Sequence, residues 1–213
     1  MTEAGNDGPT ESLVETAHGP ARVYLTAPAT GSGLLVLGHG AGGGVTAKDL
    51  QATAQVATGL DLAVALVEQP YRVAGRRSPA PAKQLDAAWT AVLMHLRSGR
   101  PDGPLIAGGR SSGARVACRT ATDVEAAAVL CLAFPLRPPG RTKAGEPKPS
   151  RIGELDGAGV PTLVVQGESD PFGMPPHAPG RHVVRLRGDH SLSSDMPGLR
   201  AAVEEWLRGV VAG

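Results

Sequence analysis

Short apolar runs alternate with amphipathic segments along most of the chain. Residues 33–37, 62–67 and 161–166 are almost wholly apolar, as expected of strands that are buried on both faces of a sheet. Residues 82–98 instead repeat apolar side chains at intervals of three and four, which predicts a helix with one buried face. Further strands are expected at 104–108, 126–133 and 182–186, and further helices at 46–58, after 113, near 151–155 and from about 195. The pattern predicts an α/β fold with a mostly parallel central sheet and helices on both faces.

The N-terminal segment differs from this alternation. Residues 13–16 and 21–25 alternate apolar and polar positions around a Gly-Pro turn, which predicts an antiparallel hairpin at the edge of the sheet. Residues 1–12 are polar and are expected to form a disordered tail, so that residues 13–213 make a single domain. No insertion between the expected elements is long enough to form a lid domain.

A candidate nucleophile lies where the run 104–108 gives way to a helical pattern. The sequence there is Gly109-Arg110-Ser111-Ser112-Gly113, the Gly-x-Ser-x-Gly form of a nucleophile elbow. Glycines flank the serine of such an elbow because a β-carbon would collide with the neighbouring strand or helix. With 29 glycines in the chain this pattern can arise by chance, so the prediction depends on residues further along the sequence.

An aspartate and a histidine follow later strands of the predicted sheet. Ser111, Asp170 and His190 each come just after the carboxyl end of a predicted strand, and such ends meet at one edge of a parallel sheet. A serine hydroxyl is a poor nucleophile until an imidazole takes its proton, and a carboxylate must orient that imidazole. These residues are therefore the candidate catalytic triad, in the chain order typical of α/β-hydrolases.

The acid has two other candidates, Glu168 and Asp189. Asp170 is preferred because it lies three residues past Gly167, where a loop can turn its carboxylate toward the last strand. Asp189 is adjacent to His190 in sequence and is expected to be too close to orient its ring.

The glycine-rich loop 38–44 allows two interpretations. As Gly38-x-Gly40-x-x-Gly43 it matches a dinucleotide-binding fingerprint, with Glu68 as the acid that binds the ribose. As a His-Gly-Ala segment after a central strand it resembles the oxyanion loop of α/β-hydrolases, in which a backbone N–H faces the substrate carbonyl. The second interpretation is preferred, because a hairpin precedes the strand whereas the fingerprint normally lies on the first β-α unit.

Several segments resemble small α/β-hydrolases without a lid that are related to the dienelactone hydrolases. The closest resemblance is to a hydrolase-like family named after a testis-expressed protein, which also includes a subunit of a histone-acetyltransferase complex. The resemblance extends from about Val36 to Leu207. The segments that carry it are residues 37–42, 108–115, 134–140, 167–170 and 189–192.

This resemblance implies an α/β-hydrolase fold with Ser111 as nucleophile, Asp170 as acid and His190 as base. It also implies that Ala41 and Ser112 supply the N–H groups of the oxyanion hole. Dienelactone hydrolases proper carry a cysteine where this chain has Ser111. We expect a serine hydrolase, a carboxylesterase that cleaves small acyl esters through an acyl-enzyme. The alternatives are a non-catalytic interaction scaffold and, less favoured, a dinucleotide-binding protein.

Charge and composition restrict the partners. With 21 basic and 20 acidic residues, the net charge of +1 gives no electrostatic footprint for nucleic acid. The polar N-terminus lacks a signal-peptide pattern and no apolar run approaches a membrane span, so a cytoplasmic protein without a membrane partner is expected. No cofactor or metal is expected, and the oligomeric state is not predicted. Arginines in predicted loops at the same sheet edge are candidates for binding a substrate carboxylate: Arg72, Arg76, Arg77, Arg110 and Arg137.

Overall fold

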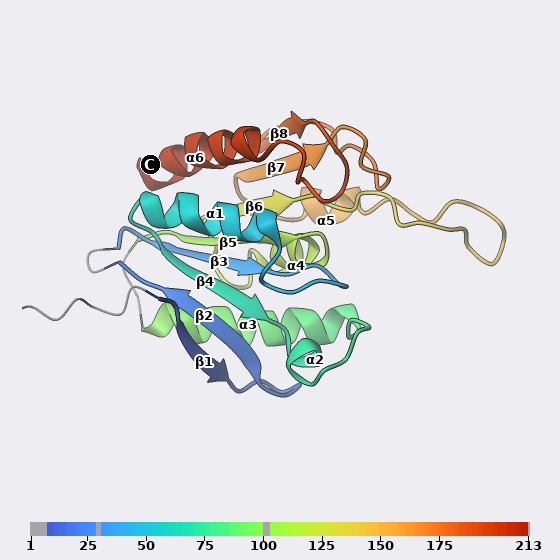
Figure 1. The fold of residues 1–213 in the computed structure, drawn as a ribbon. Coiled ribbons are helices and arrows are strands. Elements are labelled where there is room, and N and C mark those ends of the chain that lie inside the picture. Colours follow the sequence, from blue (N-terminus) through green and yellow to red (C-terminus); the bar gives the residue numbers. More distant parts are fainter. Residues whose placement is uncertain (1–7, 29–30, 100–102, 213) are drawn as a thin grey trace, which may run out of the picture.

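An eight-stranded sheet with helices on both faces forms the centre of the protein (Figure 1). The computed structural model describes residues 8–28, 31–99 and 103–212. The strands are β1 (Thr10–Val14), β2 (Ala21–Thr26), β3 (Leu34–Gly38), β4 (Ala63–Glu68), β5 (Leu105–Arg110), β6 (Ala128–Leu132), β7 (Thr162–Gly167) and β8 (Arg181–Leu186). The helices are α1 (Lys48–Gly59), α2 (Pro70–Val73), α3 (Ala82–Ser98), α4 (Ser112–Thr120), α5 (Ile152–Asp156) and α6 (Met196–Ala212).

The strands are ordered β1-β2-β4-β3-β5-β6-β7-β8 across the sheet. From β3 to β8 the strands run parallel, whereas β1 and β2 form an antiparallel hairpin that joins β4 at one edge. The central strands β3, β5 and β6 are almost completely buried, as their unbroken apolar runs predict. The predicted α/β-hydrolase fold, a mostly parallel sheet with an N-terminal edge hairpin, is confirmed, and the described residues form no lid domain.

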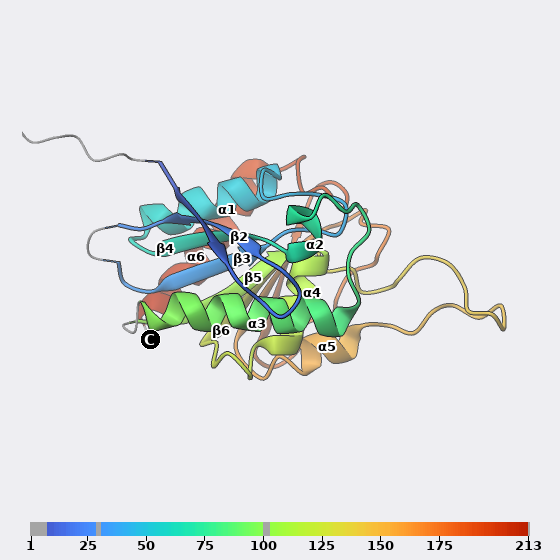
Figure 2. The same cartoon turned by 90° about the horizontal axis from the view of Figure 1, so that it is seen from below.

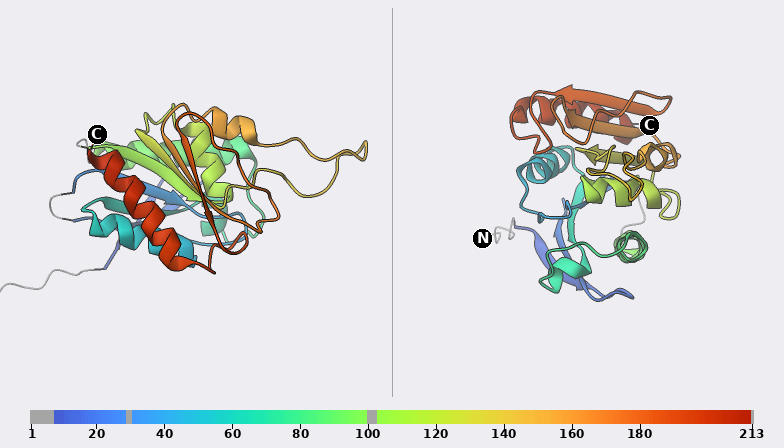
Figure 3. Two further views of the ribbon diagram at one scale, coloured as in Figure 1. Left: turned by 90° about the horizontal axis from the view of Figure 1, so that it is seen from above. Right: turned by 90° about the vertical axis from the view of Figure 1, so that its right-hand side faces the viewer.

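The two faces of the sheet are covered by different helices (Figure 3). Helices α1 and α6 pack beside each other on one face, where Leu50 and Leu199 are completely buried. Helices α3, α4 and α5 cover the other face, where Trp89 and Phe134 are among the largest fully buried side chains. The sheet is therefore shielded from water on both sides, and its carboxyl edge is left to carry polar side chains.

The N-terminal part of the chain departs from the sequence-based expectation. The expected disordered tail ended at Ser12, but β1 already begins at Thr10 and pairs with β2. Residues 1–7 of that tail lie outside the described residues. Four of the five residues of β1 are exposed, so this edge strand carries almost no apolar signal, and Glu11 is held instead by a 3.1 Å ion pair with Arg22. The expectation that residues 13–213 form one domain stays a prediction.

Two segments that were expected to be irregular are also placed by the structure. The predicted loop 68–81 contains the short helix α2, which begins with a proline as helices often do. Residues 139–150 are all exposed and project from the carboxyl side of the sheet (Figures 1 and 2). The backbone N–H of Arg151 donates to the carbonyl of Leu136 at 2.8 Å and closes the base of this projection.

None of the described helices is long and apolar enough to cross a membrane.

We predict that the fold does not tolerate a side chain at Gly113. A β-carbon there would collide with the carbonyl oxygen of Gly38 and lie 3.0 Å from that of His39, and backbone atoms cannot move aside easily. Gly113→Ala should lower the free energy of unfolding by about 1–3 kcal/mol in chemical denaturation. The control is Gly209→Ala in α6, where a β-carbon meets nothing within 4 Å and should stabilise by about 0.5–1 kcal/mol. Wild-type stability of Gly113→Ala would contradict this account of the close approach.

Candidate active site

Ser111 occupies the sharp turn between β5 and α4. Its backbone angles, φ 52° and ψ −105°, are rare for a residue with a side chain and cost about 1–3 kcal/mol. The turn is stabilised by the backbone N–H of Ser111, which donates to the carbonyl of Leu132 at the end of β6 at 2.9 Å. A β-carbon at Gly109 would lie 2.5 Å from the carbonyl oxygen of Gly38, so the elbow can form only because this position has no side chain.

The three predicted triad residues lie in one hydrogen-bonded row. The distance from Ser111 Oγ to His190 Nε2 is 3.0 Å, and that from His190 Nδ1 to Asp170 Oδ2 is 2.8 Å. The carboxylate of Asp170 is completely buried, while the His190 side chain is 20% exposed. The ring of Phe172 packs against the imidazole with centroids 4.5 Å apart. The geometry thus joins a hydroxyl, an imidazole and a carboxylate in the order that nucleophilic catalysis requires.

Contacts beyond the ends of β7 and β8 bring Asp170 to His190. The backbone N–H of Glu168 donates to Leu186 and that of Ser169 donates to Gly188, each at 2.9 Å. A β-carbon at Gly167 would collide with the carbonyl of Asp189. Glycine at the end of β7 therefore lets the two loops approach closely enough for the carboxylate to reach the imidazole.

Two further donors fix the Asp170 carboxylate. Gln166 Nε2 donates to Oδ2 at 2.8 Å, and the backbone N–H of Phe172 donates to Oδ1 at 2.9 Å. Both carboxylate oxygens thus accept hydrogen bonds from groups that cannot accept in return. Asp170 is therefore an acceptor toward His190, which places the proton on Nδ1 and leaves Nε2 free to accept the Ser111 hydroxyl proton.

The other two candidate acids are not aimed at the imidazole. Glu168 is exposed. The carboxylate of Asp189 accepts from the backbone N–H and the hydroxyl of Ser191, at 2.9 and 2.7 Å, and these bonds lower its pKa. Of the three carboxylates, Asp170 is the one that the structure brings to His190.

The predicted oxyanion residues lie next to Ser111 in the sequence or follow a residue that lies close to it. Ser112 is the first residue of α4, and Ala41 follows Gly40, whose β-carbon would lie 3.6 Å from Cβ of Ser111. Among the described residues neither the Ala41 nor the Ser112 backbone N–H donates a hydrogen bond. Both groups are thus available to an oxyanion, and that of Ser112 also lies at the positive end of a helix.

His39 holds the candidate oxyanion loop, residues 38–44, in place. Its Nε2 accepts the backbone N–H of Gln69 at 3.1 Å, so its Nδ1 carries the proton and donates to the carbonyl of Gly40 at 2.8 Å. Burial lowers the pKa of this imidazole. Tyr71 supports the same loop, because its hydroxyl donates to the carbonyl of Ala41 at 3.0 Å. The His-Gly-Ala loop is therefore fixed by side chains rather than by secondary structure.

Sequence reasoning missed Gln166, Phe172 and Tyr71. Gln166 had a detectable signal, since it is a polar residue in the otherwise apolar run at the end of β7. Phe172 lies in a loop and Tyr71 in the short helix α2, and nothing in the sequence indicates which group either of them contacts.

The candidate substrate arginines fall into different classes. Arg110 donates to Asp49 and to the carbonyl of His190, so its guanidinium is engaged within the protein rather than free for a substrate carboxylate. Arg76, Arg77 and Arg137 are exposed, and Arg72 is half-buried. Their role in substrate binding stays a prediction.

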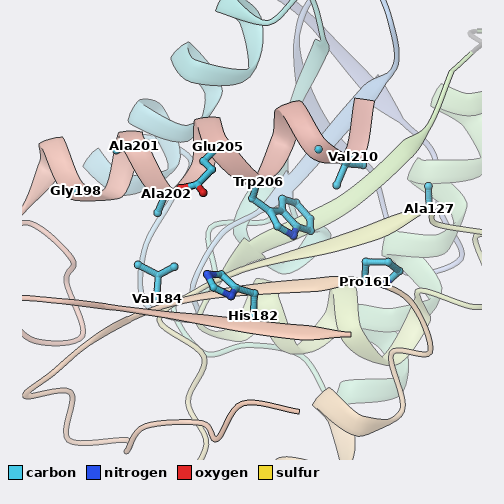
Figure 4. Close-up of a pocket in the computed structure, with 11 residues that line it drawn as sticks. Ala127, Pro161, His182, Val184, Gly198, Ala201, Ala202, Glu205, Trp206 and Val210 are labelled. Carbon is cyan, nitrogen blue, oxygen red and sulfur yellow. The ribbon is translucent and has the colours of Figure 1, made fainter. Parts of the chain in front are cut away.

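A separate groove lies at the opposite end of the strands. It measures about 850 Å³ between α6 and β8, and Figure 4 shows Trp206 and His182 pointing into it. Ala127 and Pro161 line this groove and directly precede β6 and β7, whereas the candidate triad follows the carboxyl ends of strands.

The described residues contain no group of three or more His, Cys, Asp and Glu side chains that could hold a metal ion.

The chain belongs to the alpha/beta hydrolase domain family, whose profile matches residues 31–196. The fold and the hydrogen-bonded row at its carboxyl edge agree with this class. No curated protein matches the chain.

Solved structures with this fold extend over nearly the whole chain. A serine hydrolase without a lid from Xanthomonas campestris is 20% identical with a TM-score of 0.76, covering 98% of this chain and 97% of its own. Est1E from Butyrivibrio proteoclasticus, solved with ferulic acid bound, is 14% identical with a TM-score of 0.75, covering 95% and 100%. A dienelactone hydrolase from Anabaena variabilis is 17% identical with a TM-score of 0.70, covering 95% and 98%. At these identities the likeness shows the fold.

We predict that His39 makes stability depend on pH. The unfolded chain binds a proton as pH falls through about 6.5, whereas burial keeps the folded imidazole neutral to lower pH. Its contribution to stability is therefore complete above that pH and is lost as pH falls toward the lowered folded pKa. The wild-type free energy of unfolding should fall more steeply than that of His39→Gln between about pH 7 and pH 5. Parallel curves for the two proteins would refute this assignment.

Proposed function

We propose that the protein is a serine carboxylesterase that cleaves small acyl esters through an acyl-enzyme intermediate. The observation that carries the proposal is the continuous row from Ser111 Oγ through His190 to the buried carboxylate of Asp170, with distances of 3.0 and 2.8 Å. Membership of the alpha/beta hydrolase domain family supports the general reaction class.

In the proposed first half-reaction, His190 Nε2 takes the hydroxyl proton as Ser111 Oγ attacks the ester carbonyl. The carbonyl oxygen becomes an oxyanion, which the N–H groups of Ala41 and Ser112 stabilise. Asp170 holds the ring and stabilises the imidazolium that forms. When the tetrahedral intermediate collapses, the ester C–O bond breaks and His190 passes the proton to the departing alcohol.

In the second half-reaction, water replaces the alcohol. His190 takes a proton from the water, whose oxygen attacks the acyl carbon attached to Ser111 Oγ. Collapse of the second intermediate releases the carboxylic acid and returns the proton to Ser111. The charges are balanced throughout by the buried Asp170, whose carboxylate keeps both of its fixed N–H donors.

A small-molecule ester fits the site better than a long acyl chain. The protein has only two Phe, two Tyr and two Trp residues, and of these Trp89 and Phe134 are fully buried in the core. These aromatics are therefore not available to line a long apolar tunnel at the sheet edge. A structural neighbour binds ferulic acid, which is a small carboxylic acid.

The finer placement of the chain is also a proposal. We place it in the hydrolase-like subgroup named after a testis-expressed protein, on the resemblance of segments such as residues 134–140. We further propose that residues 13–213 act as one domain in the cytoplasm. A scaffold with an unused triad is the alternative that an activity measurement excludes.

The test is hydrolysis of p-nitrophenyl acetate by purified protein. Wild type should release p-nitrophenol in proportion to enzyme, and Ser111→Ala should lower kcat by about 10³-fold or more while leaving the thermal unfolding midpoint close to wild type. The large loss follows because no other group can form the acyl-enzyme.

The matched control is Ser112→Ala. Its hydroxyl is adjacent in sequence, but its proposed contribution is made by the backbone N–H, which alanine keeps. Ser112→Ala should therefore retain most of the activity. Equal rates for Ser111→Ala and wild type, or loss only in Ser112→Ala, would defeat the proposal.

A further inference from the structure

The side chain of Arg110 is not explained by the proposed reaction. It belongs to the elbow and directly precedes Ser111, yet its guanidinium turns toward two other elements. Nε donates to Asp49 Oδ2 of α1 at 2.8 Å, and Nη2 donates to the backbone carbonyl of His190 at 2.9 Å. One planar cation thus connects the residue before the candidate nucleophile with the backbone of the candidate base.

The anchor of this contact is rigid. The Asp49 side chain is 1% exposed, and its second oxygen accepts the backbone N–H of Leu50 at 2.9 Å. Asp49 lies in the first turn of α1, which packs against α6. A guanidinium held by this carboxylate has its remaining N–H groups fixed in direction, since the group is planar.

The same guanidinium lies beside Gly40 of the candidate oxyanion loop. A β-carbon at Gly40 would lie 3.0 Å from Arg110 Nη1, so glycine at this position makes room for the cation. The oxyanion loop, the elbow and the backbone of His190 therefore meet around Arg110.

Apart from this contact, the loop that carries His190 is held by the bond from Ser169 N–H to the carbonyl of Gly188 and by the bonds of the imidazole itself. Asp189 and Ser191, on either side of the histidine, are exposed, and Leu192 is the buried apolar residue of the loop. The imidazole must stay aligned while it takes a proton from Ser111 and passes it on. A shift of about 1 Å in such a group can cost on the order of 100-fold in rate.

We propose that Arg110 is a positioning residue, which holds the backbone of His190 at the distance from Ser111 that proton transfer requires. The inference rests on the proposed esterase function and deepens it. Asp49 acts indirectly, because its carboxylate fixes the orientation of the Arg110 guanidinium. A purely structural ion pair would predict an effect on stability alone, whereas positioning predicts a loss of kcat with little change in KM.

The chain offers a matched control in Arg119. Its side chain is 19% exposed, the same as that of Arg110, and it makes a bidentate pair with Asp86 at 2.9 and 2.6 Å. Removing it breaks a partly exposed ion pair, in which Asp86 is 24% exposed, together with a 3.3 Å contact to Glu154, on the opposite face of the sheet and away from the triad.

The experiment compares Arg110→Ala, Arg110→Lys and Arg119→Ala at a temperature where circular dichroism shows all of them folded. With p-nitrophenyl acetate, both Arg110 variants should lose kcat by about 10- to 100-fold. Lysine should fail because its single ammonium cannot replace the two divergent N–H donors. Arg119→Ala should keep wild-type kcat.

Chemical rescue gives a second test. Guanidinium ion added at a non-denaturing concentration can occupy the site that Arg110→Ala leaves empty, so it should restore part of the kcat of Arg110→Ala. It should not restore the kcat of Ser111→Ala.

Hydrogen exchange gives a readout that does not need activity. Amides of residues 187–194 should exchange faster in Arg110→Ala and Arg110→Lys than in wild type, and at the wild-type rate in Arg119→Ala.

Two results would overturn the inference: unchanged exchange and kcat in the Arg110 variants, or a loss of kcat in Arg119→Ala equal to theirs. Either result would leave an active wild type as support for the esterase. A wild type that cleaves no ester would instead refute the proposed function, and faster exchange in the Arg110 variants would still show that Arg110 holds the loop.

Discussion

The arrangement of the site depends on a close approach between two pieces of backbone. The elbow that carries Ser111 lies against the end of β3, and the contact excludes side chains because β-carbons at Gly109 and Gly113 would overlap the carbonyl of Gly38. This approach allows Ser111 its left-handed backbone, directs it away from the sheet, and places it beside the loop that begins at Gly40. The unfavourable backbone angles are offset by the packing of β5 and α4, which contribute many buried residues to the core.

Several buried polar groups around the elbow have specific partners, while Gln166 Oε1 and Trp89 Nε1 have none among the described residues. Asp170 receives three donors, His39 has a partner on each ring nitrogen, and the guanidinium of Arg110 joins Asp49 to the backbone of His190. An unpaired polar group would be costly in this environment, so each pairing favours one arrangement of the loops over others. Loops that contain little regular structure are thereby held firmly enough to align reacting groups.

Much of the fold could be predicted from the sequence, because the unbroken apolar runs of the central strands and the helical period of α3 are local signals. The candidate triad could be proposed for a similar reason, since Ser111, Asp170 and His190 each follow a strand of the parallel sheet, and the structure joins them by hydrogen bonds. The start of β1 could not be predicted, because four of its five residues are exposed and leave no apolar signal. Arg110 was interpreted as a substrate-binding candidate, but its partners lie 61 and 80 residues away in sequence. Contacts between such distant residues leave no periodic pattern to detect.

The central claim is that Ser111 is an activated nucleophile. Its most direct test is reaction with a fluorophosphonate, which phosphonylates serines whose hydroxyl is activated by a general base. We expect one adduct per chain on the peptide that begins after Arg110, with fragmentation placing it on Ser111 rather than Ser112, and no adduct in His190→Ala. An adduct on Ser112, or a folded wild type that does not react, would contradict the account.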